Sequence, residues 1–290
     1  MKSLILGFAT ALITLSAQAG DILFIDINNV IPEISVVENY LKQAQAQGLE
    51  RNTRLVVVPS YQTFTWQQRK DLERLSLQIE KIFKGGGNYE EVARLGKEIR
   101  KIKTGRSDQD FTLSQLEAEL KSVVQDSTYQ FDRVFLSGHH SPSIEQNIGI
   151  LGGEFLNGFS SEMAKHILND APATRNVHSL ALLGCYTGTP KMMGQENSPW
   201  ASVLPQTSFK FGYNNPAPLK TDPANLEILR KLISAQNLVA TDLNSQAQMS
   251  VEGQKSLYQN LFSVPTQGRY LGFRIGQRYF QHPAKAEPRD

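Results

Sequence analysis

Apolar residues recur along this chain in two alternating patterns, and the alternation predicts the class of fold. Short continuous apolar runs, of the length that suits a strand, occur at 21–26, 54–59, 131–138, 177–184 and 209–213. Stretches with apolar residues at helical spacing lie between several of these runs. Strands separated by helices indicate an α/β protein built on a mainly parallel sheet with right-handed crossovers.

The segment 65–124, between the second and third predicted strands, is too long for one crossover helix. Apolar spacing predicts three helices in it, over 65–84, over 88–102 and from Thr112 onward. Gly85-Gly86-Gly87 separates the first helix from the second. We expect this helical insertion to pack on one face of the sheet.

The stretch after the third strand has a different pattern. Isoleucines alternate with glycines across 141–158, which predicts a short hairpin. Ser160 and Ser161 can then cap a helix that runs to Leu168. A hairpin and a helix are therefore expected between the third and fourth strands.

The first residues carry the features of a secretory signal peptide. Lys2 precedes an apolar run over 4–15, and an Ala17-Gln18-Ala19 cleavage pattern precedes Gly20. The apolar run is shorter than the ~20 residues that a membrane-spanning helix needs. The pattern predicts cleavage of 1–19, an exported protein (periplasmic or secreted) and no membrane insertion after cleavage. We expect one domain over 20–281 and a flexible tail over 282–290.

Composition narrows the functional classes. The formal net charge of +2 and a sequence pI near 8.5 are too balanced to favour nucleic acid as a partner. A hydrophobic content of 40% and a charged content of 20% exclude a disordered chain. The sequence lacks an H-E-x-x-H motif and paired cysteines, so neither a metal nor another cofactor is predicted.

The single cysteine is the most informative residue. Cys185 follows the apolar run 177–184, and His139 follows the run 131–138 in the same way. Parallel strands end at one edge of a sheet, so a thiol and an imidazole at two such ends can meet as a nucleophile and its base. The alternative is that Cys185 is a small buried hydrophobe, as free cysteines often are. Glycines on both sides of the cysteine, Gly184 and Gly188, favour the reactive interpretation.

Leu136-Ser-Gly-His139, followed by Leu182-Leu-Gly-Cys185-Tyr-Thr-Gly188, resembles the caspase-like cysteine peptidases, and is closest in motif to their bacterial CHAT-domain and gingipain-like members. The resemblance covers mainly 131–215. It implies a three-layer α-β-α sandwich in which a catalytic histidine ends one core strand, the nucleophilic cysteine ends the next, and a hairpin and a helix lie between them. The order of histidine before cysteine also excludes a papain-like enzyme.

The resemblance implies a role for each matching residue. Cys185 would attack a peptide carbonyl and His139 would serve as its base, with His140 as the second choice. The backbone N–H groups of Gly138 or His140, together with that of Cys185, would stabilise the oxyanion. Trp200, Tyr213 and Asn214 are the candidates for a substrate pocket. The expected partner is then a peptide or protein substrate.

Two positions depart from the family pattern. His140 stands where the family usually has glycine, and Gly184 stands where alanine is common. The first departure leaves a second hypothesis open, in which the chain is an inactive binding or interaction module with the same sheet, since fold does not fix function.

Overall fold

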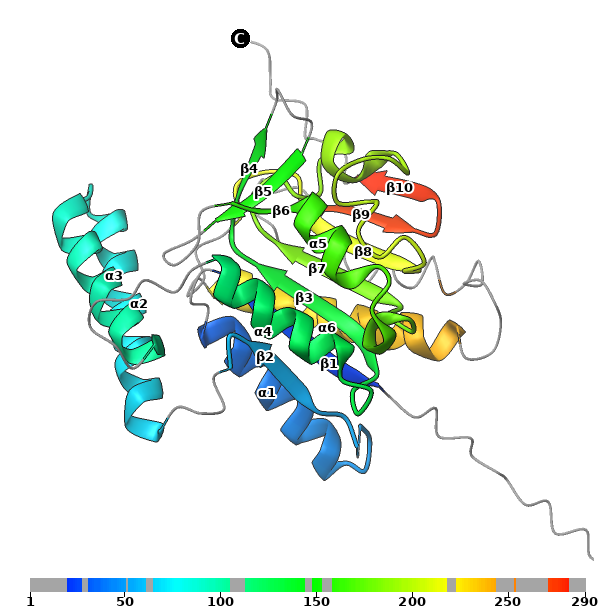
Figure 1. The fold of residues 1–290 in the computed structure, drawn as a ribbon, viewed down its shortest axis with the longest axis horizontal. Helices are drawn as coiled ribbons and strands as arrows, with labels where there is room; N and C mark the ends of the chain where they lie inside the picture. The colour runs from blue at the N-terminus through cyan, green and yellow to red at the C-terminus, as the bar shows by residue number, and fades with distance from the viewer. Residues whose placement is uncertain are drawn as a thin grey trace, which may run out of the picture.

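A seven-stranded sheet in the order β10-β9-β8-β7-β3-β1-β2 forms the middle of the molecule (Figure 1). The computed structural model describes residues 20–27, 31–50, 52–60, 65–104, 113–143, 148–152, 158–217, 223–243, 253 and 271–281. The strands of the large sheet are β1 (Asp21–Asp26), β2 (Leu55–Val58), β3 (Phe131–Ser137), β7 (Ser179–Leu183), β8 (Phe209–Tyr213), β9 (Leu271–Ile275) and β10 (Arg278–Gln281).

The sheet is mainly parallel, as the sequence predicts. The neighbouring strands from β2 through β1, β3 and β7 to β8 are all parallel to one another. β9 and β10 extend the sheet beyond β8 in antiparallel fashion. The sequence-based interpretation did not identify these two strands.

Helices cover both faces of the sheet, which gives a three-layer α/β arrangement. On one side α1 (Ile31–Ala46) contacts α6 (Pro223–Leu243), which in turn contacts β7. On the other side α4 (Leu113–Gln125) and α5 (Ser161–Leu168) contact each other and lie in front of the sheet in Figure 1. Coverage of both faces explains the continuous apolar runs, because every residue of β1 and of β7 is buried.

The helical insertion does not pack as one body on the sheet. Only α4 does so, burying Leu116, Leu120 and Val124. The other two helices, α2 (Trp66–Lys84) and α3 (Tyr89–Thr104), pair with each other, and α2 also contacts α1. Figure 1 shows this helical pair standing beside the three-layer body. The expectation that the whole insertion covers a sheet face is therefore corrected.

The predicted hairpin is a small antiparallel sheet that follows β3 almost directly. Its strands are β4 (His139–Ser143), β5 (Ile148–Gly152) and β6 (Phe159–Ser160). The Ser160 hydroxyl accepts a hydrogen bond from the Met163 amide and caps α5. Short helical turns at Pro172–Thr174 and Pro190–Gly194 complete the regular structure.

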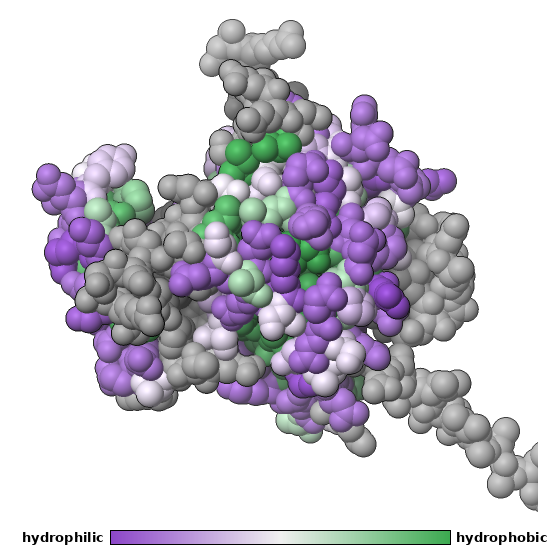
Figure 2. All heavy atoms as spheres, viewed as in Figure 1, coloured by the Kyte–Doolittle hydropathy of each residue, from purple (hydrophilic) through white to green (hydrophobic). Residues whose placement is uncertain are grey.

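The outer surface of the front helices is mostly hydrophilic (Figure 2). Within the described part of the chain, no helix combines the length and the apolar character needed to cross a membrane. The predicted signal peptide (1–19) and tail (282–290) lie outside the described residues.

Candidate active site

His139 and Cys185 follow two adjacent parallel strands at the same edge of the sheet. In the register between β3 and β7, Ser137 lies opposite Leu183. One glycine then follows each strand, before His139 on one chain segment and Cys185 on the other. The pairing of β3 with β7 ends there, because His139 begins β4 and lies opposite Gly152 in the small sheet. The carboxyl edge of an open α/β sheet is also where such folds bind ligands.

The two glycines allow the chain segments to come close together. A Cβ atom on Gly184 would lie 2.8 Å from the Gly138 carbonyl oxygen and 2.9 Å from the Cβ atom of His140. Real Cβ atoms do not approach other atoms so closely, so a side chain at position 184 would push the two segments apart. The absence of that side chain brings the backbones of residues 138–140 and 184–185 into contact.

The two candidate catalytic side chains are both accessible to solvent. The His139 side chain is exposed, and Cys185 is partly exposed. The backbone N–H of Ala217 donates to the Cys185 Sγ atom, at 3.2 Å. This contact places the Ala217 amide beside the sulfur, and no pattern in the sequence pointed to Ala217.

His140 lies inside the protein, and both of its ring nitrogens are engaged. The Trp200 Nε1–H donates to His140 Nε2 at 3.0 Å, and the indole nitrogen can only donate. His140 Nε2 therefore supplies a lone pair, and the ring proton is on Nδ1, which donates to the Cys185 carbonyl oxygen at 2.6 Å. Burial lowers the pKa of His140 to about 4, against the opposing effect of the bond to Cys185. In this arrangement His140 is neutral and has no nitrogen left to accept a proton from a thiol.

Trp200 does not line an open pocket, contrary to the sequence-based expectation. Its side chain is fully buried, and a Cβ atom on Gly149 would lie 2.1 Å from the indole nitrogen. The loop that carries Trp200 is also held by β8, because Lys210 Nζ donates to the carbonyl oxygens of Ala201 and Val203. Trp200 is therefore part of the scaffold that holds His140.

Tyr213 and Asn214 are buried as well, so they too are not exposed to a substrate in this conformation. The Tyr213 hydroxyl donates to Asn225 Oδ1 at 2.8 Å. The Tyr279 hydroxyl lies 3.2 Å from Asn214 Oδ1 and donates at the shorter distance of 2.6 Å to the Gly188 carbonyl oxygen. Both predicted pocket residues are held by side chains from α6 and β10, elements that the sequence-based interpretation did not include.

The Cys-Tyr-Thr-Gly segment forms a tight turn in which each residue has a separate function. Tyr186 has a φ of 59° and a side chain that is 39% exposed, directly beside the thiol. The buried Thr187 hydroxyl donates to the carbonyl oxygens of Leu182 and Gly184 and accepts from the Tyr213 amide. Gly188 passes so close to Gly212 that a Cβ atom added to Gly188 would lie 2.4 Å from the Gly212 carbonyl oxygen.

Tyr186 is a functional candidate that the sequence analysis missed. A non-glycine residue at positive φ is uncommon and costs conformational energy, and such residues cluster at functional sites. The only signal in the sequence is its position next to the cysteine. In the folded chain its aromatic side chain is exposed, one residue after the thiol.

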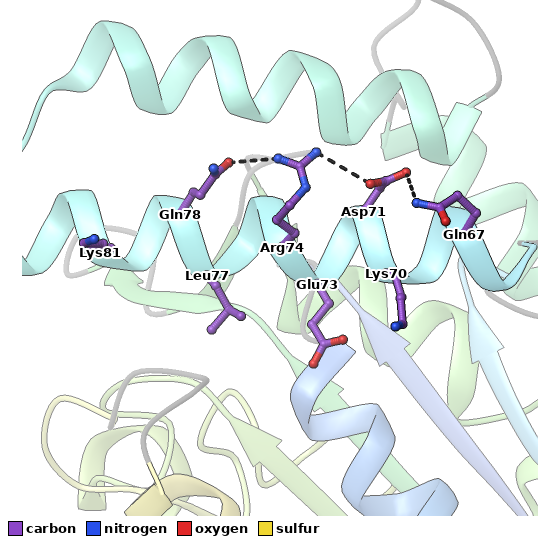
Figure 3. Close-up of a pocket in the computed structure, with 8 residues that line it drawn as sticks. All are labelled: Gln67, Lys70, Asp71, Glu73, Arg74, Leu77, Gln78 and Lys81. Carbon is purple, nitrogen blue, oxygen red and sulfur yellow. Dashed lines mark hydrogen bonds and ion pairs between the residues drawn. The ribbon is translucent and has the colours of Figure 1, made fainter.

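A shallow groove also runs along α2, away from the residues just described. Its lining consists of one helix face and contains no residue of the carboxyl edge of the sheet (Figure 3): Gln67, Lys70, Asp71, Glu73, Arg74, Leu77, Gln78 and Lys81. Arg74 contacts Asp71 and Gln78 within this face. The groove has the composition of a solvated helix surface and lacks a nucleophile.

Comparisons of this chain with protein-family models, with curated proteins and with solved structures found no match. The chemistry of the site therefore has to follow from its own residues.

Proposed function

We propose that this chain is an exported cysteine endopeptidase with a caspase-like fold, in which Cys185 is the nucleophile and His139 is its base. The observation that carries the proposal is the shared end of β3 and β7. The register between the two strands ends at Ser137 and Leu183, and His139 and Cys185 each follow two residues later, with side chains that are exposed and partly exposed. The neighbouring imidazole of His140 is excluded from acting as a base by its two internal hydrogen bonds.

The residues support covalent acyl transfer. His139 takes the proton of the Cys185 thiol, and the thiolate attacks the carbonyl carbon of a peptide bond. Backbone N–H groups of Gly138 or His140, together with that of Cys185, stabilise the negative oxygen of the tetrahedral intermediate. His139 then donates its proton to the leaving amine. Water hydrolyses the resulting thioester and restores the free thiol.

The arrangement between the two strand ends also favours a caspase-like enzyme. β4, β5, β6 and α5 lie between β3 and β7 in the chain, which corresponds to the hairpin and helix that the resemblance implies. The two departures from the family pattern, at 140 and 184, are in contact with each other. The glycine at 184 leaves room for the Cβ atom of His140, which lies 2.9 Å from where an alanine Cβ would be.

The proposal is tested by the pH dependence of Cys185 alkylation in the folded protein. A thiol activated by a nearby base reacts with iodoacetamide at pH values at which an ordinary thiol, with a pKa of about 8.5, is protonated. His139→Gln should return the pH profile to that of an ordinary thiol. His166→Gln is the matched control, because His166 is an exposed histidine on α5, away from the strand ends. An unchanged profile in His139→Gln would contradict the assignment of the base.

Hydrolysis distinguishes the peptidase from the inactive module. A broad peptide library should be cleaved by the processed protein and not by Cys185→Ala or His139→Gln, while all three unfold at similar urea concentrations. An ordinary thiol profile in the parent protein, together with no cleavage after limited proteolysis or calcium addition, would favour the binding module instead.

A further inference from the structure

The chain enters the sheet at Gly20, and this residue contacts a carboxylate. The backbone nitrogen of Gly20 donates to Asp132 Oδ2 at 2.8 Å. The next amide, that of Asp21, donates to the carbonyl oxygen of Gln130. β1 therefore begins one residue after Gly20, and its first contacts are with the start of β3.

Asp132 is held as a charged group. Its side chain is only 14% exposed, and Oδ1 accepts from Arg133 Nε at 2.9 Å. The Nε2 atom of His178 lies 3.6 Å from Oδ2, the oxygen that faces Gly20. Burial acts to raise the pKa of Asp132, but His178 and the positive charge of Arg133 outweigh it, so the pKa lies below the usual value. Arg133 is itself neutralised by Glu50, at 2.8 Å.

The position next to this carboxylate accepts only glycine. A Cβ atom on Gly20 would lie 2.6 Å from the Gln130 carbonyl oxygen and 2.9 Å from the Cβ atom of Asp132. Both neighbours belong to the start of the central strand β3 and cannot move away readily. The site is thus shaped around a backbone nitrogen that carries no side chain.

Gly20 is also the first residue after the Ala17-Gln18-Ala19 cleavage pattern. We propose that hydrolysis of the Ala19–Gly20 peptide bond creates a new amino terminus at Gly20. The ammonium group of this terminus then forms an ion pair with the Asp132 carboxylate. This inference depends on the predicted signal peptide and is independent of the proposed peptidase activity.

The chemistry of the cleavage changes the charge at this site. A signal peptidase adds water across the peptide bond, so that the hydroxyl goes to the carbonyl carbon of Ala19. The Gly20 nitrogen keeps the electron pair of the broken bond and takes a proton from the water. Below a pH of about 8 it takes a second proton from solution and becomes an ammonium group. A neutral amide with one hydrogen is replaced by a cation with three, and hydrogen bonds between charged groups are roughly twice as strong.

The pH dependence follows from the groups that face the new ammonium. Asp132 attracts it, Arg133 at the other carboxylate oxygen opposes it, and the His178 ring lies beside the oxygen that faces Gly20. The ion pair with Asp132 raises the folded-state pKa of the amine above its unfolded value of about 8. The added stability is therefore complete below pH 8 and is lost as the pH rises through the folded-state value.

The proposal is tested with two forms of the protein, one that begins at Gly20 and one that begins at Ala19, each with and without Asp132→Asn. At pH 6, urea unfolding should show an unfolding equilibrium constant about tenfold smaller for the Gly20 form than for the Ala19 form. The difference should disappear in the Asp132→Asn pair and at a pH well above 9. An advantage of the Gly20 form that survives Asp132→Asn would overturn the proposal.

A second measurement is available in case Asp132→Asn does not fold. The α-amine of the Gly20 form should react with acetic anhydride near pH 8 about tenfold more slowly in the folded protein than in urea, as read from the mass of its N-terminal peptide. Equal rates would contradict a bound ammonium. The intact mass of the exported protein tests the cleavage itself, and a terminus other than Gly20 would refute it.

Discussion

The Cβ atom of His140 lies 2.9 Å from the point where a side chain at Gly184 would begin. A histidine on one strand end and a glycine on the neighbouring one are thereby complementary in shape. The histidine at 140 requires the glycine at 184, because its Cβ atom occupies the space that a side chain at 184 would fill. The pair fixes the separation of the two segments that carry His139 and Cys185.

Gly184→Ala should destabilise the protein by roughly 1–3 kcal/mol, because a methyl group is forced into a filled space. Urea unfolding measures the effect. The matched control is Gly194→Ala, where the nearest atom to a new Cβ is 3.4 Å away, and it should be close to neutral. Adding His140→Gly to Gly184→Ala removes one of the three close contacts and should give a favourable coupling energy of about 0.5 kcal/mol or more. Strict additivity would show that the two positions do not share the space.

Trp200→Phe should leave His140 Nε2 buried without a donor. We expect a loss of about 1–3 kcal/mol from that unpaired acceptor, with a further loss from the smaller ring. In a double-mutant cycle, His140→Leu combined with Trp200→Phe should cost less than the sum of the two single changes, since no polar group is then left unpaired at this contact. Chemical unfolding of the four proteins measures the cycle. Additive costs would contradict the hydrogen bond.

His140 should make the protein less stable as the pH falls. Its pKa is about 4 in the folded state, below the usual value of 6.5. The unfolded chain therefore binds a proton first, and stability decreases as the pH falls from about 6.5 to about 4. The full effect is about 3 kcal/mol. Unfolding free energies between pH 4 and pH 7 should show a shallower slope in His140→Leu than in the parent protein, and equal slopes would contradict the prediction.

Thr187→Val keeps the shape of the side chain behind Cys185 and removes its hydroxyl. The change breaks the bonds to the carbonyl oxygens of Leu182 and Gly184 and should cost about 1–3 kcal/mol. It should also bring the alkylation rate of Cys185 closer to that of an ordinary free thiol, because the turn that positions the sulfur loses two of its hydrogen bonds. Thr189→Val is the control, since that hydroxyl bonds to the Tyr186 carbonyl oxygen at an exposed position and should matter little. Equal effects of the two changes would contradict a special role for Thr187.

The sequence predicts the elements that form by local pattern. The five parallel strands, the helices of the insertion and the cap at Ser160 all appear where apolar spacing and turn residues indicate them. These features depend on neighbours in the chain, so a single sequence is enough to find them. The assignment of His139 and Cys185 as a catalytic pair stays a prediction.

The remaining features depend on contacts between distant residues. The partners of His140 are a carbonyl at 185 and an indole at 200, and no local pattern reveals that a histidine is buried between them. Trp200 was expected at a pocket because it follows the cysteine, but the loop folds inward and is held by Lys210. The position of the α2–α3 pair also escaped prediction, because two amphipathic helices can bury their apolar faces against each other as well as against a sheet.

The position of β1 in the sheet determines when the core can form. β1 is the first strand of the chain, yet its two neighbours are residues 55–58 and 131–137. β1 can pair on both of its edges only after the third of these segments is present, because β3 is its neighbour on one edge. Pairings between segments so far apart in sequence form slowly. A chain that grows from its N-terminus therefore lacks this pairing until nearly half of it has been synthesised, and a truncation before β3 leaves the buried strand β1 with only one of its two neighbours.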